Sequence, residues 1–318
     1  LNKHDIKDIG VTLQYLPHVI QNYYGNGRDF GVNLEYFIED KPLGTAGSVK
    51  NGEHFLDETF IVISGDALTD IDLSSAIDFH KNKGATATLV PKKVEIPLEY
   101  GVVITDRGGE VTRFLEKPNW GEVFSDTVNT GIYILEPEVL EYIEPGEKFD
   151  FSRDLFPMLL EDRQPMYGYV TDEYWCDIGS PETYIQSHFD VLAGKVKGIA
   201  IGENMQEIGR DIWIGIGCDI HPTAVIEAPC YIGEQNHIEE YTHIGPYTVL
   251  GKQNIIGSST NIARSIIWDN TTIGREVELK GAAICNRVKI EPRVRIYEDS
   301  VVGDECFIGE ETIVRPSV

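Results

Sequence analysis

The sequence predicts two domains: an α/β domain in its first half and a repetitive, all-β domain in its second half. Strand-like and helix-like runs alternate in the first half, and from residue 208 onward aliphatic residues recur every six positions. With 318 residues, of which 42% are hydrophobic, the chain can bury two cores of ordinary size.

In the first half, strand-like and helix-like segments alternate as in βαβ units, which predicts a Rossmann-like sheet. Pro17 and Gly25 are start and stop signals for an early helix, and Ser180 and Gly194 are the same signals for a later one. The alternating strand-like and helix-like runs are residues 8–13, 17–25, 32–38, 60–64, 73–84 and 86–90.

The second half repeats with a period that neither an isolated helix nor an ordinary strand produces. Nineteen aliphatic anchors keep a six-residue spacing, with a step of five after Ile262 and another after Leu279. Glycine directly follows nine anchors, where we expect the missing Cβ to help the chain turn a corner. Small or β-branched residues such as Thr242 and Thr260 precede the anchors by two positions, and we expect them to point inward.

This repeat resembles the left-handed parallel β-helix of hexapeptide-repeat proteins, with three short strands per coil and about six coils here. Between the last helix and the first anchor both periodicities are lost. We therefore expect an α/β domain over residues 1–195, a linker over 196–207 and the β-helix over 208–318. An uncovered end coil exposes apolar surface and strand edges, so we expect a cap, a further domain or another subunit to cover it. Cover by another subunit corresponds to a homo-oligomer formed through the β-helix.

Charge and cysteine content narrow the function classes. There are 52 acidic and 27 basic residues, and the formal net charge of -25 repels nucleic acids and anionic membranes, so we expect neither as a partner. The five cysteines contain no CxxC pair, which favours a reducing cytoplasm over disulfides or a zinc site. No apolar stretch approaches ~18 residues and no signal peptide is visible, so we expect a cytoplasmic protein.

Two motifs follow strand-like runs, at the rim where parallel sheets bind ligands. LGTAGS (residues 43–48) has small residues that let a nucleotide approach the backbone, and a helix N-terminus behind it favours phosphate. A plain strand-to-helix loop is the alternative. In FIVISGDALTD (residues 60–70) an apolar strand ends at Gly65 and Asp66, where a carboxylate suits Mg²⁺ or equally caps a helix.

Three further motifs lie downstream. In FLEKP (residues 114–118), Glu116 suits sugar hydroxyls and Lys117 a phosphate, although an exposed ion pair is the simpler interpretation. The other two are NTGIY (residues 129–133) and WCDIGSPETY (residues 175–184). Asp177 by itself would be interpreted as a cap or loop residue.

Jointly, the motifs resemble those of bacterial sugar-1-phosphate nucleotidyltransferases, most closely the mannose-1-phosphate guanylyltransferase type that carries a β-helix. The resemblance implies a nucleoside triphosphate and a sugar 1-phosphate as substrates, with overall similarity favouring GTP and mannose 1-phosphate. Thymidylyl, uridylyl and adenylyl transfer to glucose 1-phosphate remain open, because the residues themselves do not identify the base or the sugar. It implies a catalytic Mg²⁺ held by Asp66 and Asp177, with Lys117 on the sugar phosphate. The implied substrate-binding residues are Leu43, Gly44, Thr45, Ala46, Gly47, Gly65, Tyr100, Gly101, Glu116, Asn129 and Thr130.

The sequence departs from that family at its start. In that family a glycine-rich signature, GGxGTRLxP, binds the triphosphate. This signature does not occur in these 318 residues. We therefore expect the α/β domain to be N-terminally incomplete and this chain, taken alone, to be inactive or nearly so.

Two other functions remain open. A non-catalytic regulatory subunit that binds a nucleotide sugar would keep the pocket without the phosphate-binding signature. A hexapeptide acyltransferase would need a histidine base, for which His221, His237 and His243 are the candidates in the repeats. The repeats have no long inserted loop that could build an acyl-donor pocket.

Overall fold

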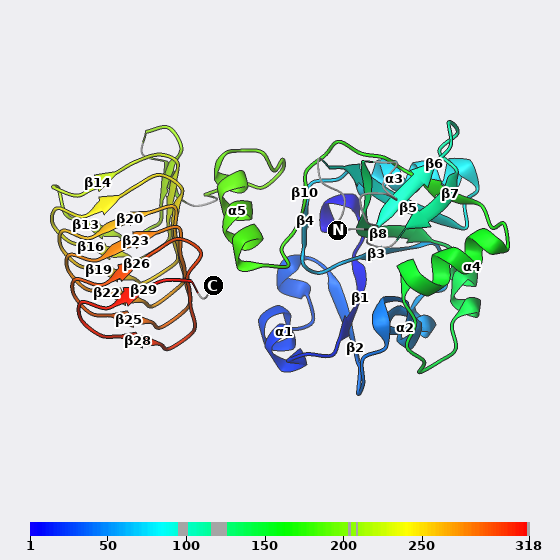
Figure 1. Ribbon diagram of the computed structural model, residues 1–318, viewed down its shortest axis with the longest axis horizontal. Helices are drawn as coiled ribbons and strands as arrows, with labels where there is room; N and C mark the ends of the chain where they lie inside the picture. Colours follow the sequence, from blue (N-terminus) through cyan, green and yellow to red (C-terminus); the bar gives the residue numbers. More distant parts are fainter. Residues whose placement is uncertain (95–100, 116–125, 203–204, 208, 317–318) are drawn as a thin grey trace. The chain divides into compact units, whose positions relative to one another are not determined.

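The computed structural model describes residues 1–94, 101–115, 126–202, 205–207 and 209–316, and the chain divides into two compact units (Figure 1). The first unit comprises Leu1–Ala67 and Ile71–Trp175 and contains the α/β elements. The second unit comprises Leu68–Asp70 and Cys176–Val318 and contains helix α5 and the stacked coils.

All the strands and helices expected in the first half form. The helices of the first unit are α1 (Pro17–Tyr24), α2 (Gly44–Asn51), α3 (Leu73–Lys83) and α4 (Phe156–Glu161), with a π-helical turn η5 (Phe151–Leu155) before α4. Its strands are β1 (Asp8–Leu13), β2 (Asn33–Ile38), β3 (Phe60–Ile63), β5 (Ala87–Lys93), β6 (Val102–Thr105), β7 (Val111–Leu115), β8 (Thr127–Leu135) and β9 (Met166–Gly168).

The main sheet is mixed, so the expectation of a parallel βαβ sheet was only partly right. Within the sheet, β5 pairs with β9 in parallel, but the long strand β8 runs antiparallel to β3, β5 and β6. β1 and β2 form a separate parallel pair. The connection between β6 and β7, residues 106–110, is too short for a crossover helix, so these two strands also pair antiparallel. The path through the sheet is β7-β6-β8-β5-β9, with β3 also on β8.

Both faces of this sheet are covered, because alternate side chains of a strand point to opposite faces. Ile132 and Ile134 of β8 belong to a core cluster under α3, which packs on β5 and β8. Tyr133 and Leu135 belong to a second cluster that includes Phe156 of α4. All four β8 side chains are buried.

The second unit begins with the strand pair β4 (Ala67–Thr69) and β10 (Trp175–Asp177), followed by α5 (Pro181–Leu192) and β11 (Gln206–Glu207). The coils then build three sheets of parallel strands, whose members lie one beneath another in Figure 1. The first sheet contains β12 (Ile212–Ile214), β15 (Cys230–Ile232), β18 (Thr248–Leu250), β21 (Ile266–Ile267), β24 (Ala283–Ile284) and β27 (Val301–Val302). The second contains β13 (Asp219–Ile220), β16 (His237–Ile238), β19 (Ile255–Ile256), β22 (Thr272–Ile273), β25 (Lys289–Ile290) and β28 (Phe307–Ile308). The third contains β14 (Val225–Ile226), β17 (His243–Ile244), β20 (Asn261–Ala263), β23 (Glu278–Lys280), β26 (Arg295–Ile296) and β29 (Ile313–Val314).

The predicted anchors form one continuous core. Ile232 pairs with Leu250 in the next coil and both are fully buried, as are most anchors between Ile238 and Val302. The first anchor, Ile208, lies outside the described residues. Thr242 and Thr260 point inward as expected, and their hydroxyls donate to carbonyls of the following coil, at 3.1 Å for Gly257 and 2.7 Å for Gly274. Cys230 occupies the same kind of position, and burial raises its pKa to about 12, which keeps it a thiol.

The glycines after the anchors have a different role from the one expected. Apart from Gly209, none of them has a left-handed backbone conformation. The positive φ of each corner falls on a later residue, such as Gln253 at 58° or Ser259 at 57°. At six of the nine a Cβ would lie less than 3.0 Å from the adjacent coil, so lack of space requires glycine there, whereas Gly209, Gly303 and Gly309 have room for a Cβ. The six are Gly215, Gly233, Gly245, Gly251, Gly257 and Gly274.

Candidate functional site

Two of the motifs predicted to bind substrate meet at one rim of the mixed sheet. Ile63, the last residue of β3, pairs with Ile132 of the antiparallel strand β8. Residues just after β3 and just before Ile132 therefore lie at the same rim. Gly131 has a φ of 74°, and a Cβ there would lie 3.4 Å from the Ser64 Cβ. Asp66 follows Ser64, whose hydroxyl donates to Asp66 Oδ1 at 2.5 Å.

The element that follows Asp66 excludes one of its two interpretations. A strand, β4, follows it instead of a helix, so Asp66 is not a helix cap. Its side chain is exposed at the rim and has a hydroxyl beside it. This oxygen-rich environment suits a hard divalent cation.

Asn129 is held in place at the same rim by several hydrogen bonds. Its Nδ2 donates to the Tyr133 hydroxyl at 2.7 Å and to Ser152 Oγ at 3.3 Å, and its Oδ1 accepts from the Gly131 amide at 3.2 Å. Its backbone amide donates to the Gly101 carbonyl at 2.7 Å, so Gly101 lies beside it. A half-buried amide with three defined partners is a rigid group against which a ligand can be oriented.

The side chain of Thr130 does not reach this rim. It is buried, and its hydroxyl donates to the Val90 carbonyl at 2.6 Å. Its own carbonyl accepts a hydrogen bond from Trp175 Nε1 at 3.0 Å. Thr130 therefore contributes to the packing of the sheet, and its hydroxyl is already used.

The LGTAGS segment is not a loop but the first turn of α2, with Leu43 at the N-cap. Leu43, Ala46 and Gly47 are buried, whereas Thr45 is exposed. The amides of Ala46 and Gly47 both donate to the Phe149 carbonyl, at 3.0 Å each. This helix N-terminus therefore does not offer those two amides to a phosphate.

The remaining predicted residues are distributed as follows. Tyr100, Glu116 and Lys117 lie outside the described residues. Asp177 belongs to the second unit, is half-buried and ends β10, so it is neither a loop residue nor the cap of α5. Ser180 is that cap, and its hydroxyl accepts from the Thr183 amide. The described residues contain no group of three or more His, Cys, Asp or Glu side chains suited to a metal ion.

Asp150 and Ser152 were missed at the sequence level. The run DFSRD reads as a helix start with Asp150 as its cap, and Asp150 does cap η5. The hydrogen bond that it accepts from the Thr45 hydroxyl joins residues 105 positions apart and has no local sequence signal.

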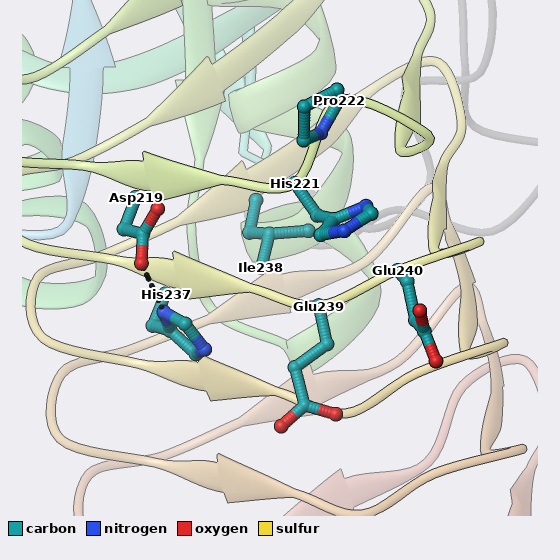
Figure 2. Close-up of a pocket in the computed structure, with 7 residues that line it drawn as sticks. All are labelled: Asp219, His221, Pro222, His237, Ile238, Glu239 and Glu240. Carbon is teal, nitrogen blue, oxygen red and sulfur yellow. Dashed lines mark hydrogen bonds and ion pairs between the residues drawn. The ribbon is translucent and has the colours of Figure 1, made fainter.

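A hollow of about 320 Å³ lies on the surface of the β-helix (Figure 2). His237 Nδ1 lies 3.0 Å from Asp219 Oδ2 within it, and His221 Nδ1 lies 2.9 Å from the Thr223 hydroxyl. Outside this hollow, His243 Nε2 lies 3.0 Å from Glu227 Oε1. The hollow is lined by Asp219, His221, Pro222, His237, Ile238, Glu239 and Glu240.

The chemistry of this hollow does not suit an acyl donor that carries phosphates. Its three carboxylates would repel such a molecule. The acyltransferase hypothesis therefore gains no support from the three histidines.

Comparison with known proteins identifies the class. Residues 1–194 match the family described as Nucleotidyl transferase, and residues 200–314 match the family described as EIF2B subunit epsilon LbH domain. The chain therefore belongs to the nucleotidyl transferase family, and the named relatives are enzymes that act on sugar phosphates. No helix in the described part of the chain is long and apolar enough to cross a membrane.

Individual relatives cover different shares of the chain. It is 34% identical over 306 residues to a UTP-glucose-1-phosphate uridylyltransferase of Synechocystis, covering 92% of this chain and 78% of that protein. It is 32% identical over 231 residues to a mannose-1-phosphate guanylyltransferase of Mycobacterium tuberculosis, covering 72% and 62%. It spans 50% of the length of a Candida albicans mannose-1-phosphate guanyltransferase. Its fold is similar to that of HddC from Yersinia pseudotuberculosis, with a TM-score of 0.51 at 27% identity, covering 58% of this chain and 79% of that chain.

Proposed function

We propose that this protein transfers a guanylyl group from GTP to mannose 1-phosphate, which yields GDP-mannose and pyrophosphate. The observation that carries the proposal is the pairing of β3 with β8, which brings Ser64, two residues before Asp66, close to Gly131, two residues after Asn129. The first turn of α2 is linked to Asn129 through Asp150 and Ser152. Several relatives are named mannose-1-phosphate guanylyltransferases, and HddC was also crystallised with GMP-PN.

In the proposed reaction, an oxygen of the sugar 1-phosphate attacks the α-phosphorus of GTP, and the bond to pyrophosphate breaks in line. The nucleophile is already an anion, so no general base is required. The chain therefore contributes mainly by placing the two substrates and neutralising their charge. We assign Asn129, Gly101 and Glu116 to the sugar, residues 43–47 and Gly65 to the nucleotide, and Lys117 to the sugar phosphate. Tyr100 and the Thr130 backbone complete the proposed sugar pocket.

Asp66 and Asp177 are the proposed ligands of a Mg²⁺ ion. Asp66 directly precedes β4, whose partner strand β10 ends in Asp177. Both supply carboxylate oxygens, the donors that Mg²⁺ prefers. When bound, the ion would neutralise charge on the triphosphate. The task of the two carboxylates would be to hold the ion.

The first test is a substrate panel on the full-length protein. Pyrophosphate release is measured with GTP, UTP, dTTP or ATP and with mannose 1-phosphate or glucose 1-phosphate. We expect GTP with mannose 1-phosphate to give the highest kcat/KM. A preference for UTP with glucose 1-phosphate, the substrates in the name of the Synechocystis relative, would overturn the choice of base and sugar but not the reaction class. Binding of GDP-mannose without turnover of any pair would favour a regulatory subunit.

The second test concerns the proposed metal ligand. Asp66→Asn should lower kcat at least about 100-fold, because a group that stabilises developing charge is typically worth this much. Asp57→Asn is the matched control, since this exposed aspartate precedes β3 at its other end. Equal turnover by the two variants would refute the role of Asp66.

Three broader expectations accompany this proposal. We propose a catalytic domain over residues 1–195, a linker over 196–207 and a β-helix over 208–318. We also propose a cytoplasmic protein that self-associates through the β-helix. Light scattering on the full-length protein, with and without surface substitutions on the coils, tests the self-association.

A further inference from the structure

Asp150 connects two of the segments assigned above to different substrates. Its Oδ2 accepts a hydrogen bond from the Thr45 hydroxyl in the first turn of α2, at 2.9 Å. Its Oδ1 accepts from the backbone amides of Ser152 and Arg153, at 3.0 and 3.3 Å, and so caps η5. The Thr45 hydroxyl in turn accepts from the Phe151 amide at 3.0 Å. Two reciprocal hydrogen bonds thus join α2 to the start of η5.

Ser152 extends this connection to the sheet. Its Oγ accepts a hydrogen bond from Asn129 Nδ2 at 3.3 Å, while the same nitrogen donates to the Tyr133 hydroxyl at 2.7 Å. The position of Ser152 depends on the cap, because its own amide is bound by Asp150. Hydrogen bonds therefore run without a break from Thr45 through Asp150 and Ser152 to Asn129.

The backbone next to Asp150 holds the first turn of α2 at close range. The Phe149 carbonyl accepts from the amides of Ala46 and Gly47, at 3.0 Å each. A Cβ at Gly44 would lie 2.6 Å from the same carbonyl oxygen. The turn consequently cannot slide along residues 149–151 without breaking these contacts. We therefore expect a displacement of the backbone at Asp150 to displace the first turn of α2 as well.

We propose that Asp150 is a positioning residue for nucleotidyl transfer, which sets the spacing between the nucleotide-binding turn of α2 and the sugar-binding Asn129. This inference rests on the proposed function, in which those two segments hold different substrates. Asp150 itself touches neither substrate. Its effect arises because a displacement in line depends on alignment, and a misplacement of ~1 Å can cost about 100-fold in rate.

The test uses Asp150→Ala, Asp150→Asn and a control, Asp154→Asn, each in the full-length protein. Alanine removes all the side-chain bonds of Asp150, whereas asparagine keeps one oxygen that can still cap η5. Asp154 lies in the same helical turn and accepts from the Asp150 amide at 2.8 Å, a bond that an asparagine oxygen can also accept. The control therefore makes the same change of charge without touching the link to Thr45.

We expect Asp150→Ala to lower kcat by about 10- to 100-fold, with KM for each substrate changed by less than about threefold. Asp150→Asn should recover part of kcat, and Asp154→Asn should match the unmodified protein. The kcat of each variant is calculated per mole of folded protein. Melting temperatures are measured in parallel, so that the loss of stability caused by removing the cap is distinguished from a loss of turnover. An unchanged kcat with a lower melting temperature, or a rise in KM for one substrate alone, would overturn the positioning role.

A second measurement separates this inference from the proposed function. If the unmodified protein turns over no nucleoside triphosphate with any sugar 1-phosphate, the proposed function fails, and hydrogen-deuterium exchange then tests the link. Asp150→Ala should increase exchange in peptides covering residues 43–51 and residues 127–133 together. An increase confined to residues 149–155 would show that Asp150 only caps η5.

Discussion

Gly257 and Gly303 occupy the same position of the hexapeptide repeat, each directly after an anchor. A Cβ at Gly257 would lie 2.6 Å from the Arg275 amide of the following coil. A Cβ at Gly303 would have Cys306 Sγ as its nearest neighbour, at 3.9 Å. Neither glycine has a positive φ. The need for glycine at this position therefore depends on what the next coil places against it.

This pair gives a prediction at the residue scale. Gly257→Ala should lower the free energy of unfolding of the β-helix by about 1–3 kcal/mol, the usual cost of overpacking. Gly303→Ala should change it by less than about 0.5 kcal/mol. Urea unfolding followed by circular dichroism compares the two variants. An equal loss in both would mean that backbone conformation, and not space, requires the glycine.

At the scale of elements, α5 packs on the first sheet of the β-helix. Phe189 is buried against Ile266, and the Arg264 guanidinium lies 4.7 Å from the centre of the Phe189 ring. Trp268 Nε1 donates to the Tyr184 hydroxyl at 2.8 Å. The helix therefore covers apolar side chains of one face of the coils.

His188 lies on this helix, and its titration gives a second prediction. Burial lowers the pKa of His188, and the hydrogen bond to the Tyr184 carbonyl opposes this effect only in part. The unfolded chain, with a histidine pKa near ~6.5, then binds the proton more readily than the folded chain. Folding stability is unaffected by His188 above about pH 6.5 and falls below it, down to the lowered pKa.

The measurement is the melting temperature at about pH 7.5 and about pH 5.5, which lie on either side of the unfolded-state pKa. His188→Gln should show a smaller decrease between the two conditions than the unmodified protein does. His54→Gln is the control, since this side chain is exposed. The same decrease in all three proteins would contradict the prediction.

At the scale of the whole molecule, the acidic excess is only partly balanced. Ion pairs join successive coils, such as Arg287 with Asp304 and Glu305, and Arg293 with Glu310 and Glu311. These ion pairs do not change the formal net charge of -25, because the acidic residues outnumber the basic ones. The proposed substrates are both anions, so the overall field opposes their approach.

This field predicts an unusual salt dependence. Raising the KCl concentration from about 20 to about 200 mM at constant free Mg²⁺ shortens the screening length, so kcat/KM for the nucleotide should rise about twofold or more. Steady-state pyrophosphate release measures it, with sucrose as a control for viscosity. A fall in kcat/KM would mean that local cations at the site dominate the association.

Much of the fold was predictable from the sequence, because its signals are local or periodic. Six-residue spacing identified the coils, and the alternation of strand-like and helix-like runs identified β1, β2, β3 and β5. The family motifs also placed Asp66, Asn129 and Gly101 among the site candidates. Periodicity could not identify the reason for each glycine, because the atoms that would contact its Cβ belong to the next coil of the chain.

Local composition and spacing set the tendency of each segment to form a strand, a helix or a coil. The antiparallel direction of β8, which brings Gly131 close to Ser64 at the end of β3, follows only from the packed sheet. The tertiary structure also turned the Thr130 hydroxyl into the core and joined Asp150 to Thr45. The physical reason is that pairing direction and hydrogen bonds between distant segments depend on the packing of the whole sheet, which no short stretch of sequence encodes.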